Sequence, residues 1–334
     1  MAEIQVTPPL AVTMGEPAGI GGEITLAAWR RLAGRGPVFL VIDDPERLRG
    51  LAGAVPVREI AEPAEAAEMF ADALPVLPLG QQVSAVPGRP DPRHGAAVIA
   101  SIARSVALTR AGVTAAVVTN PIHKATLYAA GFGFPGHTEF LAQLAGGVRP
   151  VMMLAGPSLR VVPLTVHIAL AEVPCRLDEE MIVAQGRIVA EALRREFAII
   201  RPRLAVAALN PHAGEGGTMG DEESRFIVPA VARLRADGID VVGPLPADTM
   251  FHPRARQGYD AALCMYHDQA LVPVKTLDFD EAVNVTLGLP FVRTSPDHGT
   301  ALDIAGQGRA RADSLIGAIE LAAAMARRRR EHAA

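Results

Sequence analysis

The sequence is poor in several features, and each shortage excludes a class of function. Aromatic residues make up only 4% of the 334 residues, so the base-stacking surfaces of single-strand nucleic-acid-binding proteins are not expected. The formal net charge is −4 and the sequence pI is about 6.2, which provides no basic field for a polyanion. We therefore expect no nucleic-acid partner.

Cysteines and long apolar runs are also scarce. The two cysteines, Cys175 and Cys264, show no C-x-x-C spacing, which indicates a reducing compartment without a disulfide framework or a thiolate zinc site. No uncharged apolar run reaches the roughly 18 residues of a membrane span. The first residues, "MAEIQVTPPLAVTMG", lack the pattern of a signal peptide. These features predict a cytoplasmic protein without a membrane partner.

Half of the residues are hydrophobic, and many of them form short runs rich in valine, leucine and alanine. Continuous apolar runs, without polar alternation, are typical of strands buried on both faces of a sheet. The predicted strands are 10–15, 37–43, 115–120, 151–156, 160–166, 204–210, 240–246, 261–267 and 282–288.

Longer amphipathic segments separate these runs. Helices are predicted at 94–112, 178–197 and 313–330. The segment 178–197 begins with acidic residues and ends with basic ones, as the helix dipole favours. Alternation of strands and helices predicts an α/β fold with a largely parallel or mixed sheet.

Polar residues follow several of the predicted strands. His167, His212 and His267 each end or follow an apolar run, and ligands in open α/β sheets bind beyond the carboxyl ends of the strands. Three imidazoles that leave other positions open are typical of a catalytic metal site. The alternative is that each histidine is a hydrogen-bonded structural residue, and the spacing along the chain does not decide between the two.

A second group of residues suits an anion. His137 and Thr138 follow a Pro-Gly turn in "FPGHTEF" at a predicted helix start, where free backbone N–H groups bind phosphate well. An equally simple interpretation makes Thr138 an ordinary N-cap. Further along, Lys275, Asn284 and Arg293 interrupt or follow apolar segments, and they suit carboxylate or phosphate, although Lys275 and Arg293 also fit a solvated face.

The glycine-rich stretch "MGEPAGIGGE" (14–23) lies between a predicted strand and a helix. It lacks the spacing G-x-G-x-x-G, so it is weak evidence for a dinucleotide. It predicts only a tight strand-to-helix connection near a ligand.

Several long segments together resemble the 4-hydroxythreonine-4-phosphate dehydrogenases of vitamin B6 biosynthesis, and the resemblance runs from about residue 9 to about residue 325. The segments that carry it are "VTMGEPAGIGGEI", "VVTNPIHKATLYAAGFGFPGHTEFLA", "LNPHAGEGGTMGDEE", "GPLPADTMFH", "MYHDQALVPVK" and "AVNVTLGLPFVRTSPDHGTALDIAG".

The resemblance implies a role for each group of residues. In this family three histidines bind a divalent metal (zinc, cobalt, magnesium or manganese), and they match His167, His212 and His267. The residues that match the substrate contacts are His137, Thr138, Lys275, Asn284 and Arg293. The family is homodimeric, and both subunits contribute to each metal site.

The resemblance also implies the architecture. The fold expected is a two-lobed α/β/α arrangement similar to that of isocitrate and isopropylmalate dehydrogenases, with the active-site cleft between the lobes. We expect 1–135 with 300–334 to form the first lobe. The second lobe, 136–299, is expected to carry most of the metal and substrate residues.

The implied reaction is an NAD-dependent or NADP-dependent oxidation. The alcohol of 4-phosphooxy-L-threonine becomes a ketone beside the metal, and the 3-oxo acid loses carbon dioxide to give 3-amino-2-oxopropyl phosphate. Lys275 and Asp248 are the candidates for the general base, and a metal-bound water is a third.

Two positions depart from the family's common opening M-G-D-P-A-G-I-G-P-E, because Glu16 replaces the aspartate and Gly22 replaces the proline. A sister group oxidises D-threonate or D-erythronate 4-phosphate, so a sugar-acid phosphate is the alternative substrate. A metal-dependent lyase or hydrolase that needs no nicotinamide is an alternative from another class, and a non-catalytic binding protein is a further one.

Overall fold

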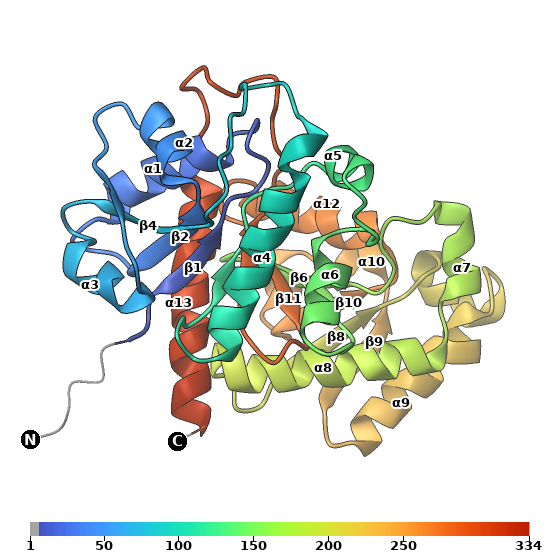
Figure 1. Ribbon diagram of the computed structural model, residues 1–334. Coiled ribbons are helices and arrows are strands. Elements are labelled where there is room, and N and C mark those ends of the chain that lie inside the picture. The colour runs from blue at the N-terminus through green and yellow to red at the C-terminus, as the bar shows by residue number, and fades with distance from the viewer. Residues whose placement is uncertain (1–6, 334) are drawn as a thin grey trace, which may run out of the picture. The chain divides into compact units, whose positions relative to one another are not determined.

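The computed structural model describes residues 7–333, and it divides into two compact units. Unit 1 comprises Met1–Pro150 and Leu289–Arg327, and unit 2 comprises Val151–Gly288 and Arg328–Ala334. Residues 1–6, which are part of the N-terminal segment that lacks a signal-peptide pattern, lie outside the described residues. The chain with its labelled elements is drawn in Figure 1.

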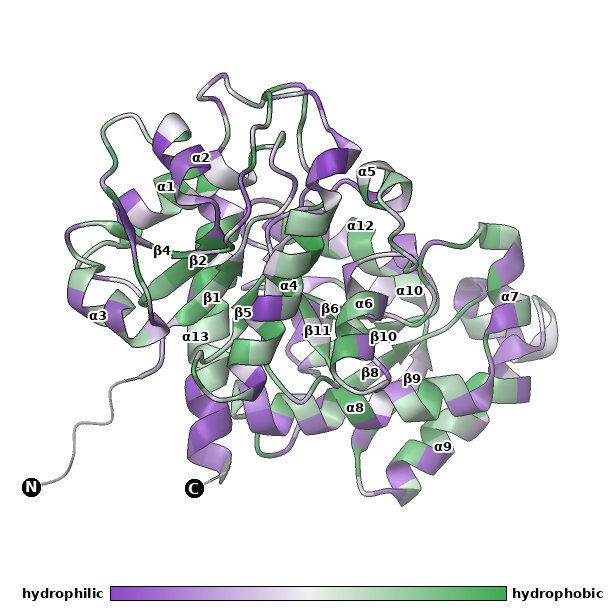
Figure 2. Ribbon diagram, viewed as in Figure 1, coloured by the Kyte–Doolittle hydropathy of each residue, from purple (hydrophilic) through white to green (hydrophobic). Residues whose placement is uncertain are grey.

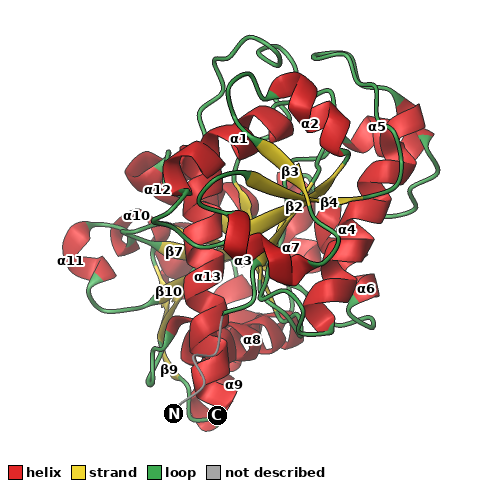
Figure 3. Cartoon of the chain, turned by 60° about the vertical axis from the view of Figure 1, so that its left-hand side comes forward, coloured by secondary structure: helices red, strands yellow, loops and turns green. Residues whose placement is uncertain are grey.

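Unit 1 contains a parallel sheet with the strand order β3-β4-β2-β1-β5-β12. Its strands are β1 (Leu10–Thr13), β2 (Phe39–Asp43), β3 (Val57–Glu59), β4 (Leu74–Pro78), β5 (Val117–Val118) and β12 (Arg293–Pro296). Every residue of β1 and β2 is buried, as expected for continuous apolar runs. Figure 3 shows β3, β4 and β2 lying together with helices around them.

The helices of unit 1 connect these strands and cover the sheet. They are α1 (Gly21–Leu32), α2 (Pro45–Leu51), η1 (Pro63–Glu65), α3 (Ala66–Met69), η2 (Pro92–His94), α4 (Gly95–Arg110), α5 (Lys124–Ala129), α6 (His137–Leu144) and α13 (Asp313–Ala333), the last of which ends among residues grouped with unit 2. One apolar cluster joins α4 and α6, and in it Phe132, Phe134 and Phe140 pack against one another.

Unit 2 contains a mixed sheet with the order β11-β6-β7-β10-β8-β9, in which β6 is antiparallel to both of its neighbours. Its strands are β6 (Val151–Ala155), β7 (Arg160–Pro163), β8 (Arg203–Ala207), β9 (Asp240–Leu245), β10 (Ala261–Cys264) and β11 (Val283–Leu287). The strands β7, β10, β8 and β9 run parallel, so their carboxyl ends meet at one edge.

Helices cover this second sheet as well. They are η3 (Leu170–Glu172), α7 (Val173–Arg176), α8 (Glu179–Phe197), η4 (Pro211–Gly217), η5 (Glu223–Ile227), α9 (Val228–Ala236), α10 (Ala247–Met250), α11 (Pro253–Arg256) and α12 (His267–Asp278). The α12 side chains Leu271 and Val274 belong to one buried apolar cluster with Ala205 and Ala262 of the sheet. Figure 2 shows hydrophobic residues concentrated in the strands, whereas the last turns of α13 are hydrophilic.

These elements confirm the α/β fold, the predicted strands and the three predicted helices. The compact units differ from the predicted lobes in where they divide the chain. The structure groups α6 and β12 with unit 1, whereas both fall within 136–299, the predicted second lobe. The reason is packing, because α6 adds Phe140 and Leu141 to the α4 core and β12 pairs with β5.

Candidate active site

The three predicted metal ligands follow three neighbouring parallel strands of unit 2. His167 lies four residues after Pro163, the last residue of β7. His267 begins α12 three residues after Cys264, the last residue of β10, and His212 follows β8 within η4. Because β10 pairs with β7 on one side and with β8 on the other, the structure brings all three segments to the same edge of the sheet.

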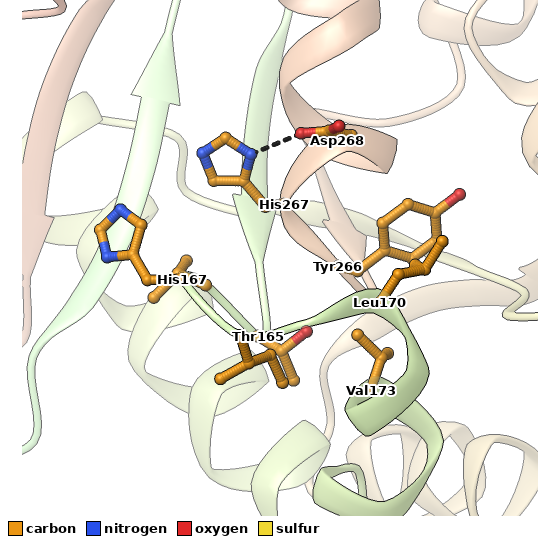
Figure 4. A pocket seen from close by; sticks show the side chains of 9 residues that line it. Thr165, His167, Leu170, Val173, Tyr266, His267 and Asp268 are labelled. Atoms are coloured by element: carbon orange, nitrogen blue, oxygen red, sulfur yellow. Dashed lines mark hydrogen bonds and ion pairs between the residues drawn. The ribbon is translucent and has the colours of Figure 1, made fainter.

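His167 and His267 face each other across a pocket of about 270 Å³. Their ring centroids are 6.0 Å apart, and the rings are inclined by 40°. The His267 Nδ1 atom is 2.6 Å from Oδ1 of Asp268. Figure 4 shows the other His267 nitrogen turned towards His167. A carboxylate on one imidazole nitrogen is the usual support of a metal-binding histidine, because it orients the ring and raises the basicity of the ligating nitrogen.

The spacing of this pair fits one divalent ion. A bond of about 2.1 Å to an imidazole nitrogen places the ring centroid about 3.2 Å from a zinc ion, so two rings at a tetrahedral angle have centroids about 5.3 Å apart. The observed 6.0 Å exceeds this value by about 0.7 Å. Small rotations of the two side chains close that difference.

His212 is not gathered with this pair. Within residues 7–333, no group of three or more histidine, cysteine, aspartate or glutamate side chains is close enough to hold a metal ion. The position of β8 explains part of the separation between His212 and His167. The strand β8 lies two strands from β7, and adjacent strands are about 4.8 Å apart. The three-histidine metal site therefore stays a prediction, supported for His167 and His267 by their geometry.

The backbone at two of these histidines is strained. His167 has φ 50° and His212 has φ 51°, a left-handed conformation that residues other than glycine rarely adopt. The conformation costs about 1 to 2 kcal/mol per residue and persists where the surrounding structure enforces it, often at functional sites. The sequence gives no sign of this strain at His167.

Hydrogen bonds from buried side chains connect the strand ends. The Thr165 hydroxyl donates to the Met265 carbonyl at 2.7 Å, which joins the segment of His167 to that of His267. The Gln269 amide accepts from Met265 N at 2.6 Å and donates to the Ala208 carbonyl at 2.7 Å, which joins β10 to β8. Neither Thr165 nor Gln269 has a role predicted from the sequence, although Gln269 stands in the "YHDQ" segment.

In unit 1, the start of α6 has the features of an anion site. Gly136 is the N-cap and provides no side-chain cap, and His137 and Thr138 are the first two helical residues. The alternative prediction, that Thr138 is the N-cap, is therefore wrong. The first backbone N–H groups of this helix have no side-chain cap, as a bound anion requires.

The side chains beside this helix start are cationic. The Nε2 atom of His137 is buried and has no hydrogen-bond partner among the described residues. Burial holds the pKa of His137 well below its ordinary value, and the positive charges of Arg293 and Lys124 lower it further. Burial also lowers the pKa of Arg293 to about 10, so this guanidinium stays charged at neutral pH. An anion here would compensate buried positive charge.

The remaining predicted residues lie in unit 2. Lys275 is partly exposed on α12, eight residues after His267, or about 12 Å along the helix axis. Asn284 is partly exposed in β11, and Asp248 is exposed near the start of α10, directly after β9.

Glu16 and Gly22, the two departures from the family's common opening, both lie in closely packed surroundings. Glu16 is 2% exposed; burial raises the pKa of its carboxyl, and the backbone N–H of Ala18 donates to it at 3.1 Å. A side chain at Gly22 would lie 2.8 Å from Leu51 Cδ1 and 3.1 Å from Arg47 Nη1. The replacement of proline by glycine at this position therefore accompanies close packing by α2.

No helix in the described part of the chain is both long and apolar enough to cross a membrane.

Comparisons with known proteins agree with the resemblance seen in the sequence. The sequence profile of the family described as pyridoxal phosphate biosynthetic protein PdxA matches residues 37–322. A 4-hydroxythreonine-4-phosphate dehydrogenase from Bradyrhizobium diazoefficiens is 55% identical over 95% of this chain and 97% of its own length.

Solved structures agree as well. The crystal structure of a 4-hydroxythreonine-4-phosphate dehydrogenase from Klebsiella pneumoniae has a TM-score of 0.86 at 39% identity and covers 97% of this chain and 99% of that one. A branched-chain phosphotransacylase from Enterococcus faecalis shares the fold with a TM-score of 0.55 at 12% identity over 95% of this chain and 99% of that one. The chain therefore belongs to the PdxA family of pyridoxal phosphate biosynthetic proteins, the family of the 4-hydroxythreonine-4-phosphate dehydrogenases.

Proposed function

We propose that this chain oxidises 4-phosphooxy-L-threonine to the 3-oxo acid, which loses carbon dioxide to give 3-amino-2-oxopropyl phosphate. The observation that carries the proposal is the match to a dehydrogenase of that name over 95% of the chain. As a member of the family, the chain is an oxidoreductase of pyridoxal phosphate biosynthesis that uses a nicotinamide cofactor and a phosphorylated substrate.

We propose His167, His212 and His267 as the ligands of a divalent metal. The paired rings of His167 and His267 and the carboxylate of Asp268 on His267 support this assignment. When bound, the metal supplies positive charge beside the reacting oxygens and the nicotinamide cofactor supplies the oxidant. Imidazole ligands favour zinc or cobalt over magnesium or manganese.

His137, Thr138 and Arg293 are proposed to bind the phosphate of the substrate. The uncapped start of α6 and the fixed charge of Arg293 support this role. The buried Nε2 of His137 supplies a further polar contact, because a neutral imidazole can donate or accept a hydrogen bond there. Lys124 adds a charge that acts on the same imidazole.

Lys275 and Asn284 are proposed to contact the rest of the substrate. Lys275 and Asp248 are the proposed candidates for the group that takes the proton of the substrate hydroxyl. Both lie on segments that follow strands of the histidine-bearing edge, because α12 follows β10 and α10 follows β9.

We also propose that the protein is a homodimer whose subunits share each metal site. Exposed apolar side chains lie beside the histidines, since Leu170 and Ile168, which line the pocket, are 67% and 36% exposed. An interface between subunits would remove these two apolar side chains from water. A second subunit would also supply the ligands that the described residues of one chain do not gather.

Turnover of two substrates by the metal-loaded dimer tests the proposed reaction. We expect reduced nicotinamide to form rapidly with 4-phosphooxy-L-threonine and slowly with D-erythronate 4-phosphate, and NAD and NADP are compared in the same assay. Preference for the sugar acid would overturn the proposed substrate, and product formed without nicotinamide reduction would indicate a lyase or hydrolase.

Substitution of a single histidine tests the metal ligands. We expect His212→Ala to lose turnover and bound metal, whereas His252→Ala, an exposed histidine that caps α11, retains both. Full turnover in His212→Ala would refute the three-histidine assignment.

A further inference from the structure

The turn that carries His212 has an unusual backbone. Five successive residues, from His212 to Gly216, have positive φ values of 51°, 54°, 78°, 41° and 65°. Three of them are His212, Ala213 and Glu215, which lack the conformational freedom of glycine. A left-handed run of this length does not form from local preference, so other parts of the protein must hold it in place.

Glu223 is the side chain that holds the entrance to this turn. It is 5% exposed and begins η5, a π-helical turn. Its Oε1 accepts hydrogen bonds from Leu209 N at 2.9 Å and Asn210 N at 2.8 Å, and its Oε2 accepts one from Asn210 Nδ2 at 2.9 Å. These bonds fix the two residues that precede Pro211 and His212.

The same carboxylate lies against the middle of the turn. A Cβ atom added at Gly214 would lie 2.6 Å from Glu223 Oε2, so the turn closes around the carboxylate only because position 214 is glycine. Glu223 therefore determines both where the left-handed turn begins and how closely it folds back.

We infer that Glu223 is a positioning residue that sets the left-handed turn so that His212 can bind the metal. The inference rests on the proposed function, in which His212 is a ligand. Glu223 has no contact with the substrate in this role and acts only through His212. A ligand on a strained turn needs such support, because supporting contacts keep ligands oriented in metal sites.

A carboxylate is the one side chain of this length that accepts all three bonds. In Glu223→Gln one oxygen becomes an NH2 group, and either orientation sets it against an N–H donor. Glu223→Asp keeps the charge but shortens the reach by about 1.5 Å. The two variants separate the loss of an acceptor from the loss of reach.

Glu196 offers a matched control. It is another buried carboxylate of unit 2, 3% exposed and bonded to Arg195 and Arg329. Burial raises the pKa of Glu196, so its replacement by the neutral isostere glutamine removes a charge that the fold disfavours. Glu196→Gln therefore tests the general effect of changing a buried carboxylate.

The experiment measures cobalt and zinc affinity by chelator competition, the visible spectrum of the cobalt protein, and amide hydrogen exchange of the metal-free protein. We expect Glu223→Gln to weaken metal binding by about 10- to 100-fold and to change the cobalt spectrum towards that of His212→Ala. Exchange of the Leu209 and Asn210 amides should accelerate even without metal. Glu223→Asp should show an intermediate metal affinity. Glu196→Gln should bind metal with the affinity of the parental protein.

Parental affinity and an unchanged spectrum in both Glu223 variants would overturn the inference. So would a spectrum of lower amplitude but the same shape, because that result indicates loss of folded protein without loss of a ligand. If Glu223→Gln does not fold, Glu223→Asp decides alone by the same criteria. If His212→Ala itself binds metal with parental affinity, the proposed three-histidine metal site is refuted. That result is distinct from a refutation of the positioning role of Glu223 alone.

Discussion

Gln269→Leu is the sharpest test of how the histidine-bearing strands are held together. The Gln269 side chain is 8% exposed, and its amide bonds the Met265 N–H and the Ala208 carbonyl at 2.6 and 2.7 Å. Met265 and Ala208 are 0% and 1% exposed. Leucine has similar length but no polar atoms, so the substitution leaves both backbone groups buried without these partners.

The magnitude follows from the two lost bonds. Each buried group left without a partner costs about 1 to 3 kcal/mol, and the apolar contacts of leucine offset about 1 kcal/mol. We therefore expect a net loss of about 3 kcal/mol, which corresponds to about a 100-fold larger population of the locally open state of this edge. Gln185→Leu is the control, because Gln185 donates a single bond, to the Leu164 carbonyl at 3.1 Å, and should cost about 1 kcal/mol.

The assay must report on unit 2 alone. The single tryptophan, Trp29, lies in α1 of unit 1, so its fluorescence does not report on this edge of unit 2. Amide hydrogen exchange of β8 and β10 follows the affected edge. Unchanged exchange in β8 and β10 of Gln269→Leu would refute the claim that this amide joins the two strands.

Two further predictions concern the turn and the anion site. Gly214→Ala should lower the free energy of unfolding by about 2 kcal/mol, measured by urea unfolding followed by circular dichroism, because its φ is 78° and its Cβ would meet Glu223. Gly216→Ala, which has φ 65° and open space around its Cβ, should cost about half as much, and equal costs would contradict the close approach to Glu223. Lys124→Ala should raise the pKa of His137, because it removes a cation that disfavours the imidazolium, and an unchanged pKa in a proton NMR titration would show that Lys124 does not act on this ring.

Part of the fold could be predicted because the apolar runs are continuous. Runs such as 37–43 and 204–210 predict buried strands, and the structure contains β2 and β8 there. The strand β12 was not predicted, since "RTSP" contains no apolar residue and its burial depends on pairing with β5. The helix α12 was also missed, because Pro273 interrupts its pattern and it begins three residues after β10.

The candidate site also combines features that the sequence predicts with features that it does not. The positions of His167, His212 and His267 after apolar runs predict a shared sheet edge, and the strand order β7-β10-β8 confirms that edge. The sequence does not predict the left-handed turn at His212 or the hydrogen bonds by which Glu223 positions it. A buried carboxylate in "GDEE" has the same sequence pattern as a solvated one. Contacts between residues far apart in the sequence determine such features, and no local period records them.

The proposed function depends on the binding of one divalent ion by His167, His212 and His267. Anomalous diffraction from crystals of the zinc-loaded protein, measured at the zinc absorption edge, tests it directly. We expect one strong peak per chain within about 2.1 Å of an imidazole nitrogen from each of the three residues, contributed by either subunit. A peak bound elsewhere, or one that His212 does not contact, would contradict it.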